Sequence, residues 1–200
     1  MVKIISLLCA FLLLSINPVL AISSINVDVI REAQSYGKVK AHDQLKDFLL
    51  PWISYEEKAV KLDETAEHAY LYTAFLLMAT DAREKSLNGQ SVTLLDSERI
   101  LADYTDLLSF SIALFGDKQD FIQHASVVLK QDKKIIKAYQ ANIPSHGEQI
   151  SKEGALPIYK GQCYLYFIEK DIDLTSPIRL VITTQDQKEH TFYFDMDKIK

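Results

Sequence analysis

The spacing of hydrophobic residues differs between the first two-thirds of the chain and its last third. Up to about residue 130, apolar residues mostly recur every three or four positions, which places them on one face of a helix. Beyond the polar segment KQDKK (residues 130–134), apolar and polar residues alternate, which is typical of strands. Helices followed by strands predict the α+β class: an N-terminal layer of three or four helices packed on a C-terminal antiparallel β-sheet or small β-sandwich.

The first helix is expected over residues 25–36, where four apolar or aromatic residues share one helical face: Val27, Ile30, Ala33 and Tyr36. Gly37 is expected to end this helix. The next segment, residues 43–62, is ambiguous. Pro51 interrupts any continuous helix, and the alternation that follows it permits a strand over residues 53–62.

A long central helix is expected from Asp63, its N-cap, to Leu87, and it ends at Asn88-Gly89. Residues 69–79, AYLYTAFLLMA, are apolar on nearly every helical face. A helix with this pattern should be covered on all sides by the rest of the protein.

Two more helices are expected directly after the central one. Thr93 and Asp96 form a capping-box pattern at the start of a helix that ends at Gly116. Asp117 is then the N-cap of a helix that reaches about residue 129. The helical period is carried by Ile100, Leu101, Tyr104, Leu107, Leu108, Ile112 and Phe115 in one helix and by Phe121, Ile122, Ala125, Val128 and Leu129 in the other.

The last third of the chain predicts strands. Residues 135–143 can form one strand, and residues 159–170, YKGQCYLYFIEK, are the clearest. Residues 177–184 and 189–195 flank the polar turn QDQK and predict a hairpin. The longest loop of this part covers residues 142–157.

The N-terminus has the pattern of a signal peptide over residues 1–21. Lys3 is followed by an apolar run over residues 4–14, and compact side chains precede an expected cleavage after Ala21. Cys9 lacks the small preceding residue of a bacterial lipoprotein signal. The run is short for a membrane span, so we expect an exported product with no membrane span, and an uncleaved N-terminal anchor is the alternative.

Cleavage would leave a mainly helical module over residues 22–132, with the possible strand 53–62, and an antiparallel β module over residues 133–200. The chain carries 27 acidic and 22 basic residues, a formal net charge of −5, and has no basic cluster. Nucleic acid and anionic membrane surfaces need a concentrated positive field and are excluded as main partners. The mature part has no N-x-S/T acceptor, which favours a bacterial source in the periplasm, cell envelope or medium.

Two carboxylate and histidine pairs with a spacing of four are the candidate metal or acid/base residues: Glu64 with His68, and Asp120 with His124. On a helix each pair would share one face, and together they could hold a divalent metal. The alternative is that the acids lie in first helical turns because they face the positive end of the helix dipole. The spacing matches neither H-E-x-x-H nor the di-iron E-x-x-H pattern.

Four acids just beyond predicted strands are a second candidate cation site, for calcium: Asp171, Asp173, Asp195 and Asp197. Acids in turns are ordinarily solvated, and nothing resembles an EF-hand loop. Cys163 is the only cysteine after cleavage, so no internal disulfide can form. A thiol and imidazole pair with His124 or His190 can be drawn, but a thiol within an apolar strand is a poor nucleophile.

Aromatic residues are frequent in both parts, among them Tyr70, Tyr72, Tyr159, Tyr164, Tyr166, Phe192, Tyr193 and Phe194. Most would be core residues, but on an exposed sheet they would form a surface for a peptide or glycan. We therefore expect an exported, non-catalytic protein that binds a protein or envelope component through the sheet or the 142–157 loop, without a cofactor. The alternatives are a metal-dependent enzyme using the two carboxylate and histidine pairs, and a chaperone or inhibitor of another exported protein.

Overall fold

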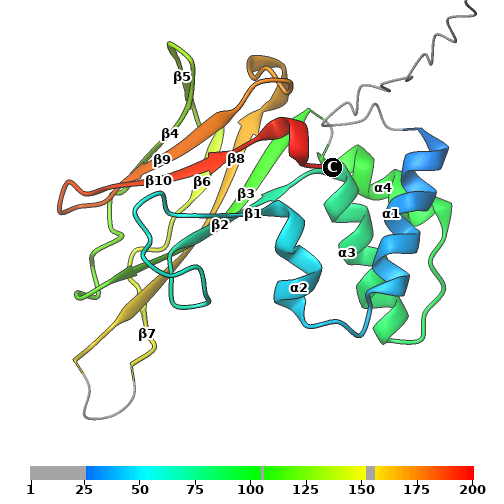
Figure 1. Cartoon of the computed structure of the whole chain (residues 1–200), viewed down its shortest axis with the longest axis horizontal. Coiled ribbons are helices and arrows are strands. Elements are labelled where there is room, and N and C mark those ends of the chain that lie inside the picture. Colours follow the sequence, from blue (N-terminus) through cyan, green and yellow to red (C-terminus); the bar gives the residue numbers. More distant parts are fainter. Residues whose placement is uncertain (1–25, 105, 152–155) are drawn as a thin grey trace, which may run out of the picture.

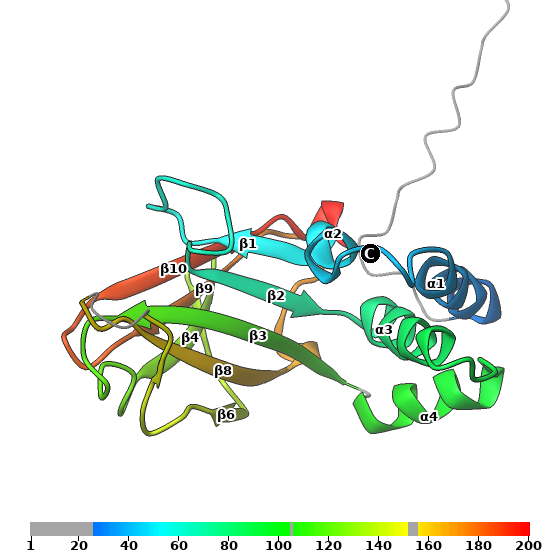
Figure 2. The ribbon, with the colours of Figure 1, turned by 90° about the horizontal axis from the view of Figure 1, so that it is seen from below.

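The computed structural model describes residues 26–104, 106–151 and 156–200, and the expected signal peptide lies outside them. The protein is α+β, with four α-helices and antiparallel sheets (Figure 1). Figure 2 shows the helices beyond one end of the strands, so that the molecule has a helical end and a sheet end. In the described ranges, no helix has the length and apolar character needed to cross a membrane.

The helical end consists of α1 (Val27–Val39), α2 (Leu45–Leu49), α3 (Ala74–Leu87) and α4 (Leu94–Tyr104). The side chain of Asn26 caps α1 by accepting hydrogen bonds from the amides of residues 28 and 29. The prediction that Gly37 ends this helix is wrong. Gly37 is buried inside α1, because the helix packs so closely on α3 that a side chain at this position would meet the α3 backbone.

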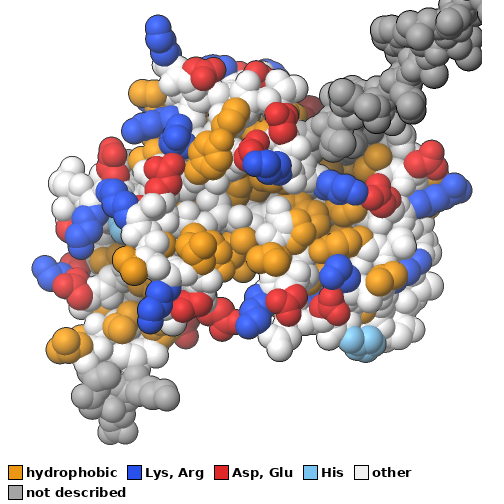
Figure 3. Space-filling view, viewed as in Figure 1, with side chains coloured by type: hydrophobic (Ala, Val, Ile, Leu, Met, Phe, Trp, Pro, Cys, Tyr) orange, Lys and Arg blue, Asp and Glu red, His pale blue; other side chains and the backbone are white. Residues whose placement is uncertain are grey.

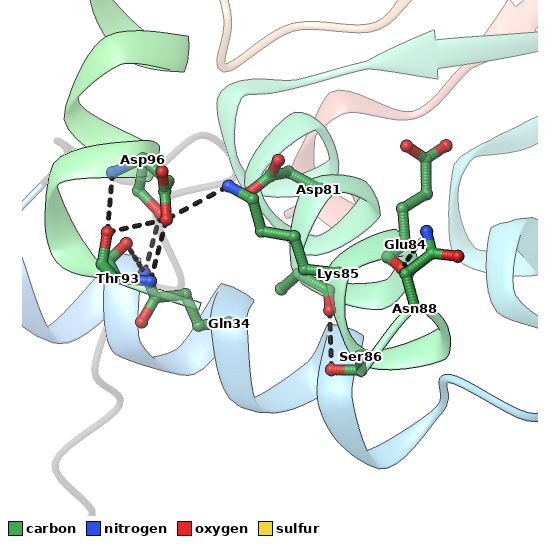
Figure 4. A network of polar contacts seen from close by, with 10 residues as sticks. Gln34, Asp81, Glu84, Lys85, Ser86, Asn88, Thr93 and Asp96 are labelled. Atoms are coloured by element: carbon green, nitrogen blue, oxygen red, sulfur yellow. Dashed lines mark hydrogen bonds and ion pairs between the residues drawn. The ribbon is translucent and has the colours of Figure 1, made fainter. Parts of the chain in front are cut away.

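Thr93 and Asp96 form the predicted capping box of α4. The amide of Thr93 donates to Oδ2 of Asp96 (3.0 Å), and the amide of Asp96 donates to Oγ1 of Thr93 (3.3 Å). Figure 4 shows the Lys85 ammonium reaching Asp96, at 3.1 Å, and Asp81, at 2.9 Å. Hydrogen bonds from Thr93 and Lys85 lower the pKa of Asp96 to about 2, so this carboxylate stays ionised and joins α3 to α4.

The strands form two antiparallel sheets. Sheet A has the order β1 (Ile53–Tyr55), β2 (His68–Tyr72), β3 (Leu107–Gly116), β8 (Tyr159–Ile168) and β6 (Gln140–Asn142), and the short β7 (Glu148–Gln149) also pairs with β8. Sheet B has the order β10 (Glu189–Phe194), β9 (Ile178–Thr183), β4 (Ser126–Gln131) and β5 (Lys134–Lys137). Short 3-10 helices cover Leu50–Trp52, Glu169–Asp171 and Met196–Lys198.

A single hydrophobic cluster joins the two sheets and the helical end. The ring of Phe110 on β3 lies 5.7 Å from that of Phe167 on β8 and 5.4 Å from that of Phe194 on β10. Trp52 stacks on Phe75 of α3 at 6.0 Å between ring centroids, and its indole N–H donates to the main-chain oxygen of residue 200. The inner face of sheet A is therefore fully used by the core.

Several helices predicted in the middle of the chain are wrong. Residues 63–67 are a loop, and the expected central helix is divided into strand β2 and helix α3, whose N-cap is Thr73. The expected helix 93–116 ends at Tyr104 and is followed by β3, and the expected helix 117–129 is a series of turns leading into β4. The possible strand 53–62 is only three residues long.

One physical reason applies to the segments that became β2, β3 and β4. The apolar residues of these segments satisfy a period of two as well as a helical period, and pairing across the sheet decides between them. Strand β3 lies between β2 and β8 and forms ten residue pairs with β8. Strand β3 thus lies in the same sheet as β8, and β4 lies in the same sheet as β9. The structure confirms the predicted strand β8 and the predicted hairpin of β9 and β10.

Candidate functional site

The face of sheet A that points away from sheet B carries tyrosines on both sides of a row of small residues. In the register of the sheet, Ser111 of β3 lies between Tyr70 of β2 and Tyr164 of β8. Ser109 likewise lies between Tyr72 and Tyr166. We call these six residues the tyrosine face: Tyr70, Tyr72, Ser109, Ser111, Tyr164 and Tyr166. Figure 2 shows no helix of the described residues over this side of strands β2, β3 and β8.

Alternate residues of strands β2 and β8 belong to the core and to the tyrosine face. In β8, Cys163 and Leu165 are fully buried, whereas Tyr164 between them is 48% exposed. In β2, Ala69 and Leu71 are buried, and the residues between and beside them are half-buried. Because successive side chains of a strand point to opposite sides, the same segments build the core on one side and the tyrosine face on the other.

A pocket of ≈ 450 Å³ lies beside the tyrosine face. It is bounded by α2, β1, residues 62–65 and β2, and its lining includes His68 and Tyr70. Tyr70 therefore belongs to both the pocket and the tyrosine face. Figure 3 shows hydrophobic side chains across the middle of the molecule, over the region of β1 in Figure 1, with charged side chains on both sides.

Aromatic rings continue from the tyrosine face into the pocket. His68 lies edge-on to Tyr70, with ring centroids 5.3 Å apart, and to Tyr55 of β1, at 6.3 Å. Nδ1 of His68 donates to the carbonyl oxygen of Ala66 at 2.8 Å, since a carbonyl can only accept. This bond fixes the ring orientation and leaves Nε2 as the ring nitrogen that can meet a ligand.

The hydroxyl groups of the tyrosine face are neutral hydrogen-bonding groups. Burial raises the pKa of Tyr70, and burial followed by the proximity of Tyr164 raises the pKa of Tyr72. Both phenols therefore keep their protons at neutral pH and can donate as well as accept. None of the six residues of the tyrosine face carries a formal charge, whereas the lining of the pocket includes Lys46 and Glu64, which pair at 3.5 Å.

The helical geometry behind the metal hypothesis is absent. Glu64 lies in the loop before β2 and pairs with Lys46, and His68 is the first residue of β2. Asp120 and His124 lie in the turns between β3 and β4, where His124 has φ 57°. Neither pair shares a helix face. Within the part of the chain that the structure describes, no group of three or more His, Cys, Asp or Glu side chains could hold a metal ion.

Two of the four acids proposed for calcium, Asp173 and Asp195, have local side-chain partners. Oδ1 of Asp173 accepts from the amide and hydroxyl of Thr175, and Oδ2 accepts from the hydroxyl of Ser176. These bonds lower the pKa of Asp173. Asp195 pairs with Lys198 on the surface. These contacts are those of acids that stabilise turns.

A half-buried polar network joins the loop before β2 to both sheets, and the sequence patterns did not indicate it. Oε2 of Glu67 lies 2.6 Å from Nδ1 of His190 on β10, and Oε1 of Glu67 accepts from the amide of Phe115 at 3.0 Å. Nε2 of His190 contacts Oγ1 of Thr184 at 3.2 Å, and that hydroxyl lies 2.6 Å from Oδ1 of Asp186. Glu67 and His190 are 123 residues apart, so no local pattern could reveal the pair.

The network places a hydroxyl, an imidazole and a carboxylate in the order of a catalytic triad, but the proton directions differ from those of a triad. Hydrogen bonds from Lys188 and Thr184 hold the pKa of Asp186 well below its usual range, so its carboxylate accepts the Thr184 proton. The single hydroxyl proton of Thr184 is then directed to Asp186 and is not placed for transfer to His190. Thr184 is also buried. This network fixes the loop of residues 56–67, which forms one wall of the pocket.

Cys163 faces the core side of β8 and is expected to be unreactive in the folded protein. It is fully buried, and burial raises the pKa of its thiol to about 12. A rise of this size lowers the thiolate fraction near pH 8 by about a thousandfold. Alkylation by iodoacetamide at pH 8, followed by mass spectrometry, should be at least about a hundredfold slower in native than in urea-unfolded protein. Equal rates in the two states would contradict the buried placement.

Comparison with known proteins does not indicate a function for the tyrosine face or the pocket. No protein-family model matches the chain, and the search of curated proteins found no match. The tyrosine face, the adjoining pocket and the Glu67 network therefore have to be interpreted from their own geometry and chemistry.

Proposed function

We propose that this protein is an exported, non-catalytic binding protein whose ligand docks on the tyrosine face and the adjoining pocket. The observation that carries the proposal is a sheet face without a covering layer that presents tyrosines on both sides of a row of small residues. Tyrosine gives a large contact area at a small cost in side-chain entropy, and its hydroxyl adds a hydrogen bond. Such a surface needs no group that transfers a proton or holds a metal.

The signal-like residues 1–21 support export of the protein. The absence of a basic cluster argues against nucleic acid as the ligand. We therefore place the ligand in the cell envelope or outside the cell. The chemistry at the pocket fits a docking role, since its lining combines aromatic and apolar side chains such as Tyr55, Ile53 and Leu50 with charged side chains, of which Lys46 and Glu64 pair with each other.

Replacing Tyr70 and Tyr164 together with alanine should abolish association with the envelope. The test is co-sedimentation of purified protein with envelopes isolated from the producing cells, and we expect wild-type protein in the pellet and the variant in the supernatant. Each removed ring would cost about 1 to 2 kcal/mol of binding, as for aromatic anchors of other interfaces, so the two together weaken binding at least tenfold.

The matched control is Tyr193→Ala. Tyr193 is 38% exposed on β10 of sheet B, where the Arg179 guanidinium lies over its ring, and it is not part of the tyrosine face. This variant should sediment like the wild type. Loss of sedimentation in the control, or unchanged sedimentation of the Tyr70 and Tyr164 variant, would contradict the proposed binding surface.

A further inference from the structure

The chemistry of the tyrosine face restricts the class of ligand. Tyr70, Tyr72, Tyr164 and Tyr166 offer rings with phenolic hydroxyls. Further residues of the same face are Gln162 of β8, which donates to Ser111 at 2.9 Å, and Gln140 and Asn142 of β6, which lie opposite Tyr166 and Tyr164. The surface thus combines flat apolar rings with uncharged donors and acceptors.

Ser109 limits the contacts that the face can make. The residue is only 7% exposed, and its Oγ is shielded from solvent and has no hydrogen-bond partner in the part of the chain that the structure describes. A ligand on the surface cannot reach this oxygen, so recognition depends on the tyrosines on either side of Ser109 and on the polar side chains beside them.

We infer that the ligand of the tyrosine face is an uncharged oligosaccharide. The inference rests on the proposed function. A sugar ring has an apolar face of C–H groups, which can stack on tyrosine, and a rim of hydroxyls, which can pair with glutamine and asparagine. A neutral ligand matches the uncharged side chains around the tyrosines. The next charged residues of the same face are Lys160 of β8 and Glu148 of β7, which lie opposite each other and have opposite signs, whereas an anionic polymer would need a concentration of positive charge.

A peptide ligand fits this face less well. Extended peptides are usually bound by main-chain hydrogen bonds along the edge of a sheet. Here β2, β3 and β8 are paired on both sides, so the main chain beneath the tyrosines is already used. Only side chains are available for recognition, and these are the rings and uncharged polar groups that a sugar requires.

The dimensions of the surface fit a short chain of sugars. From β1, which contributes Tyr55 to the pocket, to β8, which contributes Tyr164, the ligand would cross three interstrand spacings of about 4.8 Å, or roughly 14 Å in total. A chain of several rings spans this distance, with one end in the pocket beside His68 and the other on the ring of Tyr164.

The test is isothermal titration of the purified chain with neutral oligosaccharides. The probes are hexamers of β-1,4-linked glucose, α-1,4-linked glucose and β-1,4-linked N-acetylglucosamine, together with an array of neutral envelope glycans. We expect at least one neutral glycan to bind, with at least tenfold weaker binding to Tyr164→Ala. Tyr193→Ala should bind like the wild type.

Failure to bind any neutral glycan would overturn the inference, and so would binding that is unchanged in Tyr164→Ala. The envelope sedimentation test separates this failure from a failure of the proposed function. If sedimentation depends on Tyr70 and Tyr164 but neutral oligosaccharides do not release the protein from the envelopes, the proposed binding function stands and the inference of a sugar ligand is overturned. Circular dichroism of each variant controls for folding, and the exposed position of Tyr164 should tolerate its replacement.

Discussion

Replacing Glu67 with alanine is expected to lower the free energy of unfolding by about 2 to 4 kcal/mol, measured by urea denaturation at pH 7. The side chains of Glu67 and His190 are only 17% and 12% exposed, and their contact is 2.6 Å. Removing the carboxylate takes away the acceptor of the Phe115 amide and the partner of His190 at once. Leaving a buried donor without its partner costs the full desolvation free energy of that donor.

The matched control for this prediction is Glu57→Ala. Glu57 lies in the same loop and also pairs across to sheet B, through Arg179 at 3.0 Å, but both side chains are well exposed. An exposed pair of this kind contributes about 0 to 1 kcal/mol. If the two variants lose the same stability, the Glu67 network is not the main attachment of the loop that forms the pocket wall.

Gly37→Ala should destabilise the protein by about 1 to 3 kcal/mol. A Cβ at this position would lie 2.2 Å from the carbonyl oxygen of Ala79 and 2.9 Å from the amide nitrogen of Arg83, both in the α3 backbone. Backbone atoms cannot move aside as a flexible side chain can, so α1 and α3 have to separate. On an exposed helix the same replacement would stabilise by about 1 kcal/mol, because alanine is the better helix former.

Ser35→Ala is the control for this effect, since residue 35 is exposed on the same helix and gains the propensity of alanine without a collision. Urea denaturation should show a change within about 0.5 kcal/mol for Ser35→Ala and a clear loss for Gly37→Ala. Stabilisation by Gly37→Ala would mean that the two helices are not in backbone contact at this point.

Parts of the fold with an unambiguous local signal were predictable. The alternation of β8 and the polar turn between β9 and β10 carry their pattern within a few residues, as does the Thr93 and Asp96 cap of α4. The segments that became β2 and β3 have apolar residues at spacings compatible with both a helix and a strand. Their neighbours in the sheet, which lie far away in sequence, decided the outcome.

Only part of the candidate site could be predicted from the sequence. Tyr164 and Tyr166 were expected in a strand, but Tyr70 and Tyr72 were expected in a helix, so nothing placed the two pairs on either side of β3. The metal hypothesis depended on the same misassigned helices. The proposal that exposed tyrosines on a sheet would bind a peptide or glycan followed from the residue types, whereas the position of the surface required the register of the strands.

The ten-pair ladder between β3 and β8 would make the proposed ligand binding depend on correct folding. It is fixed near its ends by the bond from the Phe115 amide to Glu67 and by the bond from the Glu169 amide to the Asp106 carbonyl. A shift of the ladder by one residue would turn Phe110 toward the solvent and Ser109 toward the core. A shifted molecule would therefore lose its stability together with its tyrosine face, so that a stable population with an altered ligand preference cannot accumulate.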